Sequence, residues 1–139
     1  MIASVVIDCS ITMSWCFPDE AEPASLGVFD KLRTEAVLVP DLWFLEVANV
    51  LSIAERRKRI PPEKSAAFIL LLNTLNIEVD HESSSRAFEH ILPLCRQHGL
   101  TSYDVAYLEL ALRRRLPLAS LDTPLRAAAK KLGVKLLGR

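Results

Sequence analysis

Four acidic residues stand out because each lies beside apolar sequence that a folded chain would bury. Asp8 and Asp122 each follow a short apolar run with the character of a strand. Asp104 lies in the first turn of one expected helix, and Glu46 lies in the second turn of another that is otherwise almost entirely apolar. Because the carboxyl ends of parallel strands meet at one edge of a sheet, we expect these acids to gather there.

Four carboxylates that lie close together repel one another, and this repulsion must be offset. At about 5 Å and an effective dielectric near 20, each pair costs roughly 3 kcal/mol. Such a group persists only if some carboxyls hold protons or if a cation binds, and all-oxygen ligation suits Mg²⁺ or Mn²⁺. A metal held in this way activates water and stabilises charge on a phosphate, so the pattern indicates phosphodiester cleavage.

Each aspartate also has a simpler interpretation as a helix cap. Asp8 and Asp122 precede expected helices, and Thr101-x-x-Asp104 resembles a capping box. Taken singly, each is more often a cap than a catalytic group. The joint arrangement is what favours a site.

Glu46 cannot be explained in this way, because it lies too far inside its helix to cap it. At helical spacing it shares a stripe with Leu42 and Val50, which we expect to face the core. An unpaired carboxylate there is costly, so its alternative role is a buried ion pair with an arginine.

The elements that position these acids alternate between strands and helices. The expected strands are residues 2–7, 36–39, 77–79, 118–121 and 134–137. The expected helices are residues 11–17, 23–35, 41–59, 63–75, 83–98 and 101–115, and a last one with Thr123 as N-cap and Pro124 as N1. This alternation predicts one α/β domain over residues 1–139, with a parallel sheet covered on both faces.

Composition narrows the functional classes. Lys plus Arg equals Asp plus Glu at 17 each, so a polyanion would have to bind local basic runs such as residues 56–59, 113–115 or 130–131. Three cysteines without a C-x-x-C pair indicate reduced thiols in a cytoplasmic protein. The three histidines have no zinc-site spacing, and we find neither a signal peptide nor a membrane span.

Four segments together resemble the acidic motifs of PIN-domain nucleases, in that family's order and over nearly the whole chain. They are Val5-Val6-Ile7-Asp8-Cys9-Ser10, Phe44-Leu45-Glu46-Val47-Ala48-Asn49, Leu100-Thr101-Ser102-Tyr103-Asp104-Val105-Ala106-Tyr107 and Ala119-Ser120-Leu121-Asp122. Within that superfamily the chain looks most like VapC, the ribonuclease toxin of VapBC toxin–antitoxin pairs. The segment Trp15-Cys16-Phe17-Pro18-Asp19-Glu20 is similar to one VapC subgroup, which often has Lys where this chain has Ser14.

The resemblance implies a three-layer α/β/α PIN-like fold with a central, mostly parallel five-stranded sheet. It also implies an endoribonuclease whose catalytic and metal-binding residues are Asp8, Glu46, Asp104 and Asp122, around Mg²⁺ or alternatively Mn²⁺. Donors that orient these carboxylates would be Ser10, Asn49 and Thr101. The expected partners are RNA, a VapB-type antitoxin and a second copy of the chain, with no membrane. Some of Trp15, Phe17, Trp43 and Phe44 would line a groove for an antitoxin helix, and the others would belong to the core.

Other functions stay open at this point. A receiver domain would have a second acid after Asp8, and a phosphatase with an Asp nucleophile would have an Asp where this chain has Ser10. A PIN-like nuclease of RNA processing and a non-catalytic α/β interaction module are the remaining alternatives. Only the latter would show no stabilisation by metal.

Overall fold

The computed structural model describes residues 2–139 and has a five-stranded sheet at its centre. The strands are β1 (Ala3–Ile7), β2 (Ala36–Pro40), β3 (Ile77–Asp80), β4 (Leu118–Ala119) and β5 (Leu136–Leu137). They lie in the order β3-β2-β1-β4-β5, and every neighbouring pair is parallel. The predicted five-stranded parallel sheet is therefore confirmed, although β4 and β5 are shorter than expected.

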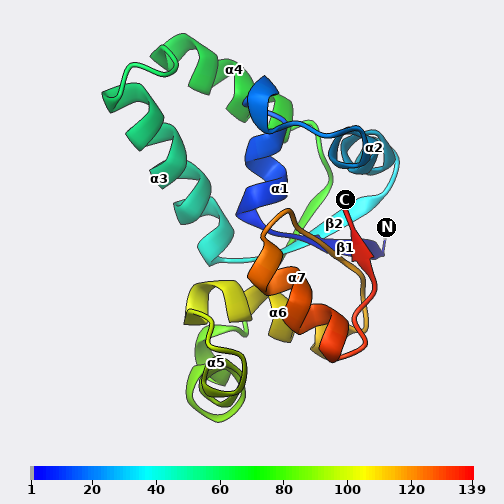
Figure 1. Ribbon diagram of the computed structural model, residues 1–139. Helices are drawn as coiled ribbons and strands as arrows, with labels where there is room; N and C mark the ends of the chain where they lie inside the picture. The colour runs from blue at the N-terminus through cyan, green and yellow to red at the C-terminus, as the bar shows by residue number, and fades with distance from the viewer. Residues whose placement is uncertain (1) are drawn as a thin grey trace.

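Helices cover both faces of this sheet, as predicted. Those before β3 are α1 (Cys9–Ser14), α2 (Pro23–Leu32), α3 (Leu42–Arg56) and α4 (Pro62–Leu72). Those after it are α5 (Leu92–His98), α6 (Ser102–Arg114) and α7 (Thr123–Lys131). Figure 1 shows α1 to α4 on one side of the sheet and α5 to α7 on the other, with α3 and α4 forming an arch. No helix within residues 2–139 is long and apolar enough to cross a membrane.

The strand order creates a switch point between β1 and β4. The chain builds outward from β1 through β2 to β3, then returns to the other side of β1 for β4 and β5. Helices that leave β1 and β4 therefore depart on opposite faces of the sheet, and the ends of two such strands are where open α/β sheets form the crevice that binds ligands. Asp8 follows β1 directly at this point, and Ser120 follows β4.

Most helices end a few residues from their predicted limits, and two differences have a clear local cause. Asp122, not Thr123, is the N-cap of α7, and its side chain accepts from the backbone N–H of Leu125. The helix expected over residues 83–98 is broken into a 3₁₀ turn (Ser84–Arg86), a π turn (Ala87–Ile91) and α5. Pro93 has no N–H to donate to the carbonyl of Glu89, which explains why the chain widens before it.

The core stripe of α3 is also displaced from the predicted one. Its buried residues are Trp43, Val47, Leu51 and Ala54, whereas Leu42, Glu46 and Val50 are only half-buried. The expectation that Glu46 faces the core is therefore wrong by about one position around the helix. Glu46 lies at the border of the core, which is where a carboxylate can reach both protein donors and solvent.

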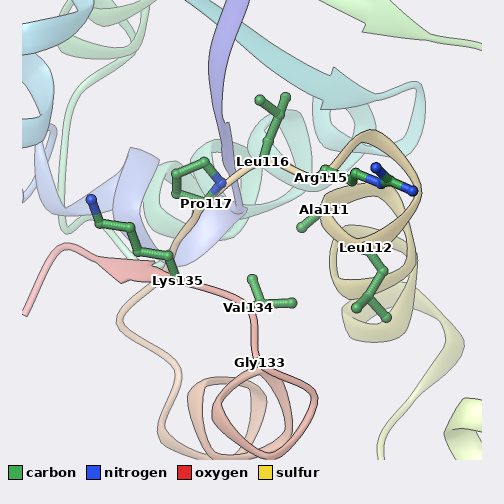
Figure 2. Close-up of a pocket in the computed structure, with 8 residues that line it drawn as sticks. All are labelled: Ala111, Leu112, Arg115, Leu116, Pro117, Gly133, Val134 and Lys135. Atoms are coloured by element: carbon green, nitrogen blue, oxygen red, sulfur yellow. The ribbon is translucent and has the colours of Figure 1, made fainter.

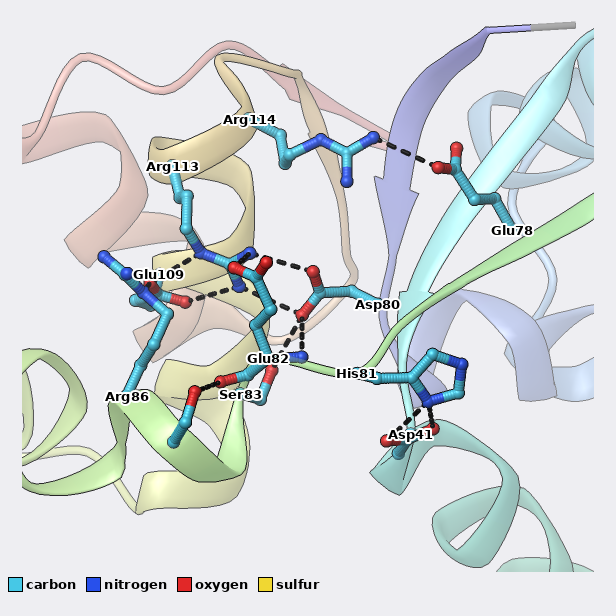
Figure 3. A network of polar contacts seen from close by, with 11 residues as sticks. Asp41, Glu78, Asp80, His81, Glu82, Ser83, Arg86, Glu109, Arg113 and Arg114 are labelled. Atoms are coloured by element: carbon cyan, nitrogen blue, oxygen red, sulfur yellow. Dashed lines mark hydrogen bonds and ion pairs between the residues drawn. The ribbon is translucent and has the colours of Figure 1, made fainter.

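A buried charge network fixes α6 to the end of β3, and Figure 3 shows it from close by. Arg113 donates to both carboxylate oxygens of Asp80, at 2.8 and 3.0 Å, and to both oxygens of Glu109, at 2.9 and 3.1 Å. Arg86 also donates to Glu109. Bidentate pairing of this kind sets both distance and orientation, so the network holds the helix that carries Asp104.

Candidate active site

Asp8 is the most buried member of the site, at 4% exposure. Its Oδ1 accepts from the N–H of Ile11 at 3.0 Å and from the hydroxyl of Ser10 at 2.7 Å, and its Oδ2 accepts from the hydroxyl of Ser120 at 2.5 Å. The first bond makes Asp8 the N-cap of α1. The predicted cap role is therefore confirmed, and the predicted role in metal binding stays a prediction.

Ser120 is a polar residue to which the sequence analysis gave no role. It is fully buried, donates to Asp8 and accepts from the N–H of Asp122 at 3.0 Å. Arg126 donates to its backbone carbonyl at 2.8 Å and thereby holds the end of β4. A polar side chain near the end of a predicted apolar strand, two residues before an acid, was the available signal.

Glu46 is held by Tyr107, the second residue that sequence reasoning missed. The phenol of Tyr107 donates to Oε1 of Glu46 at 2.5 Å, so the alternative of an arginine ion pair is wrong. Tyr107 is itself 1% exposed, and burial together with Glu46 raises its pKa, which keeps the phenol protonated as a donor. Its spacing of three residues from Asp104 on α6 could have indicated a shared helix face.

A second connection sets α3 against the strand that carries Asp8. The indole N–H of Trp43 donates to the hydroxyl of Thr12 at 2.9 Å, and that hydroxyl donates to the backbone carbonyl of Asp8 at 2.7 Å. Glu46 lies one turn further along α3. Its position relative to Asp8 is therefore fixed through two buried hydrogen bonds as well as through Tyr107.

Asp104 and Asp122 complete the edge from two different helices. The hydroxyl of Thr101 accepts from the N–H of Asp104 at 3.2 Å, so Thr101 is the N-cap of α6. Asp122 uses Oδ2 to cap α7. Both aspartates are half-buried, so each can present carboxylate oxygen to the crevice.

The four carboxylates interact electrostatically as a row. Burial is the main cause that raises the pKa of Asp8, to about 6, and the charge of Asp122 adds to it. Burial likewise raises the pKa of Asp104, with Asp122 contributing, and that of Glu46, with Asp104 contributing. Charge repulsion therefore links Asp8 with Asp122, Asp122 with Asp104, and Asp104 with Glu46, and this set is called the acidic row.

Carboxylate oxygens are the type of ligand that a hard divalent cation prefers, but these four side chains do not form a closed cage around one position. Within residues 2–139, no group of three or more His, Cys, Asp or Glu side chains is arranged closely enough to hold a metal ion. Mg²⁺ usually keeps several waters and binds through only one or two carboxylates, so pairs in this row are sufficient. Burial is the main cause of the raised pKa values, and repulsion between the carboxylates adds to it.

The three expected orienting residues have different surroundings. Ser10 donates to Asp8 and accepts from the N–H of Leu121, so it bridges the ends of β1 and β4. Thr101 caps α6, and its hydroxyl also lowers the pKa of Asp104 against the effect of burial. Asn49 is exposed, and its amide forms no hydrogen bond with any residue in the described part of the chain.

Several members of the basic runs already have acidic partners. Arg59 pairs with Asp19 and Glu20 at 2.9 Å and lies 3.7 Å above the ring of Phe17. Arg113 and Arg114 also form ion pairs. The basic side chains of these runs without ion pairs among residues 2–139 are Arg56, Arg57, Lys58, Arg115, Lys130 and Lys131.

One sizeable cavity lies away from the carboxylates. It has a volume of about 410 Å³ and is formed by the end of α6 and by the segments that lead into β4 and β5 (Figure 2). These segments enter the sheet at its amino-terminal edge, opposite the acids. Figure 2 shows Arg115 and Lys135 pointing to opposite sides of it, so they do not converge on a common ligand.

Comparisons with known proteins agree with this architecture. The chain superposes on PAE2754 from Pyrobaculum aerophilum with a TM-score of 0.71 and 21% identity, covering 96% of this chain and 83% of that one. VapBC2 from Rickettsia felis, solved with a promoter DNA fragment, gives a TM-score of 0.67 at 10% identity over 95% and 96% of the two chains. VapC20 from Mycobacterium tuberculosis, a toxin that cleaves the sarcin–ricin loop, gives 0.66 at 13% identity over 90% and 95%.

Comparison of the sequence with family profiles identifies the family of this chain. No curated protein sequence matches the chain significantly. The profile of the PIN domain matches residues 5–131, a range that includes all four carboxylates and both strands of the switch point. The chain therefore belongs to the PIN domain family.

Proposed function

We propose that this protein is a metal-dependent endoribonuclease and the toxin of a VapBC-type toxin–antitoxin pair. PIN domains are nucleases, and this chain has the PIN domain over most of its length. The observation that carries the proposal is the row of four mutually repelling carboxylates at the switch point between β1 and β4. A protein keeps such a row where a cation and a phosphate are to be bound.

In this proposal Asp8, Asp122, Asp104 and Glu46 hold Mg²⁺ or Mn²⁺. The bound metal would supply an activated water and charge stabilisation for the phosphate. The residues of the chain do the positioning. Ser10 and Ser120 donate hydrogen bonds to Asp8 from the ends of both strands and so fix the orientation of its carboxylate. Oδ2 can still accept one further bond, which the metal would use.

Tyr107 performs the corresponding task for Glu46. Its hydrogen bond occupies Oε1 and leaves Oε2 as the oxygen that would bind the metal. Because the phenol stays protonated, it donates throughout the neutral pH range. Asp104 and Tyr107 share α6, so the network around Arg113 also fixes their approach to α3.

The partners follow from the solved relatives and from the surface. VapBC2 pairs toxin with antitoxin, and VapC20 cleaves a structured RNA. An apolar cavity of about 210 Å³ lies between α3 and α4, and it includes Trp43, half-exposed Phe44 and Ile69. An amphipathic antitoxin helix would fit such a groove. A homodimer and a cytoplasmic location, which suits three free cysteines, belong to the same proposal.

The decisive experiment is cleavage of a structured RNA pool by the purified protein. Reactions would contain Mg²⁺, Mn²⁺ or EDTA, with Asp104→Asn as the inactive variant and Asp30→Asn, an exposed residue of α2, as the matched control. We expect cleavage by wild type and Asp30→Asn that needs metal and is absent in Asp104→Asn. Cleavage by Asp104→Asn at the wild-type rate would refute the site. Absence of both cleavage and metal-dependent stabilisation would leave a non-catalytic module.

A further inference from the structure

A pocket of about 300 Å³ adjoins the carboxylates and has no role in the mechanism above. It is lined by Leu42, Leu45, Glu46 and Asn49 of α3 and by Tyr103 of α6. The α3 residues follow the spacing i, i+3, i+4 and i+7, so they form one continuous face of the helix. Glu46 belongs both to this pocket and to the acidic row, and Tyr103 directly precedes Asp104. Whatever enters the pocket is therefore next to the bond that the carboxylates would act on.

The chemistry of the lining is specific. Tyr103 is 63% exposed and Leu45 is 76% exposed, and they line one pocket, so their apolar surface is available to a ligand there. Asn49 adds a side-chain amide with both a donor and an acceptor, and no residue among 2–139 uses either. The pocket thus combines an aromatic ring, an aliphatic wall and one unused amide.

We propose that this pocket binds the nucleobase beside the scissile phosphate of single-stranded RNA, and that it selects adenine. The inference rests on the proposed nuclease function, which it deepens by naming the substrate. Unstacked RNA bases bind by stacking on aromatic side chains and by hydrogen bonds at their edges. Tyr103 provides the ring, Leu42 and Leu45 provide the apolar wall, and Asn49 reads the edge.

The preference for adenine follows from matching donors with acceptors. An asparagine amide pairs in two places with adenine, whose amino group donates and whose N7 accepts. Guanine presents two acceptors at this Hoogsteen edge, so a guanine that enters in the same orientation would leave the carbonyl of Asn49 without a partner. Pyrimidines offer a smaller ring for stacking on Tyr103. Adenine therefore uses both features of the pocket.

The test is competitive cleavage of single-stranded substrates that are randomised on either side of the cut, in Mn²⁺. We expect wild type to select adenine at one flanking position. Asn49→Ala should reduce this selection about tenfold or more, and Asn73→Ala, at the exposed C-cap of α4, should not. Tyr103→Ala should raise KM about tenfold or more, whereas Tyr103→Phe keeps the ring and should keep KM. No base preference, or a preference that survives Asn49→Ala, would overturn the proposal.

Two further measurements separate the pocket from the proposed function and from other occupants. Fluorescence anisotropy of A-rich and U-rich 12-mers in Ca²⁺ measures binding without needing turnover. If no RNA is cut but A-rich RNA binds better in an Asn49-dependent way, the pocket stands and the nuclease proposal fails. If RNA is neither cut nor bound selectively, the pocket proposal fails too. Light scattering of Tyr103→Ala detects the remaining case, because loss of a dimer would show that a second copy covers the pocket and would overturn the inference.

Discussion

Replacing Asp8 by Asn should stabilise the metal-free protein at neutral and alkaline pH. Asn is as good an N-cap as Asp, so its carbonyl can keep the bond from the N–H of Ile11. Its amide can face Ser120, whose hydroxyl oxygen is able to accept as well as donate. The substitution therefore removes the buried charge and preserves most of the local geometry.

The size and sign of the effect follow from the pKa of Asp8. Burial raises it from 3.8 to about 6, so ionisation in the folded state is penalised by roughly 2 pH units, or about 3 kcal/mol. A raised folded-state pKa contributes stability that is fully present below pH 3.8 and is lost as the pH rises through 6. Asn carries no such penalty. At pH 8 the variant should be more stable by about 2 to 3 kcal/mol, allowing for a weaker bond to Ser120, and at pH 3.5 the difference should vanish.

Urea unfolding in EDTA at a series of pH values would measure this difference. Asp30→Asn removes a carboxylate that is 72% exposed and should change the free energy of unfolding by no more than about 0.5 kcal/mol at any pH. A variant Asp8→Asn that is no more stable than wild type at pH 8 would refute the conclusion that burial opposes ionisation of Asp8. A stabilisation independent of pH would instead point to a packing effect.

Three other perturbations test separate parts of the structure. Millimolar Mg²⁺ or Mn²⁺ should raise the Tm of wild type more at pH 8 than at pH 5, because protons compete with metal at Asp8, and equal shifts in a calorimetric scan would contradict this. Tyr107→Phe should lower metal affinity or kcat about 10- to 100-fold without unfolding the chain, since Glu46 loses its donor. A metal titration would show whether the affinity is unchanged, and circular dichroism would show whether the chain has unfolded; either result would contradict this prediction. Arg113→Met leaves Asp80 and Glu109 buried without their shared cation and should cost about 3 to 5 kcal/mol in urea unfolding, so a loss under 1 kcal/mol would exclude a structural role for the network.

The sequence predicted the elements well because their signals are local. β1 and β2 are continuous apolar runs, and β-branched residues in them favour strands. Gly99 ends α5 in the left-handed conformation that its position after the last helical turn indicated. Boundaries failed where two signals compete, as at Asp122 and Thr123, since both residues are good caps.

The partners of the acids were harder to predict, because they come from distant parts of the chain. Ser120 reaches Asp8 across 112 residues, and Tyr107 reaches Glu46 across 61. These contacts exist only because β4 lies beside β1 and because α6 packs against both strands. Periodicity within a segment carries no information about such neighbours.

The most consequential error concerned the side of α3 that Glu46 occupies, and it has a physical lesson. A helix that is apolar nearly all round has no unique buried stripe, so its rotation is set by what it packs against. In this protein the hydrogen bond from Trp43 to Thr12 and the hydrogen bond from Tyr107 to Glu46 set the rotation of α3 about its axis. That choice buries Trp43 and Val47, brings Glu46 to the acidic row, and leaves Leu45 and Asn49 facing outward beside it. The proposed catalytic carboxylate and the proposed base pocket are thus two consequences of the same helix orientation, so a substitution such as Thr12→Val that releases Trp43 should impair both together.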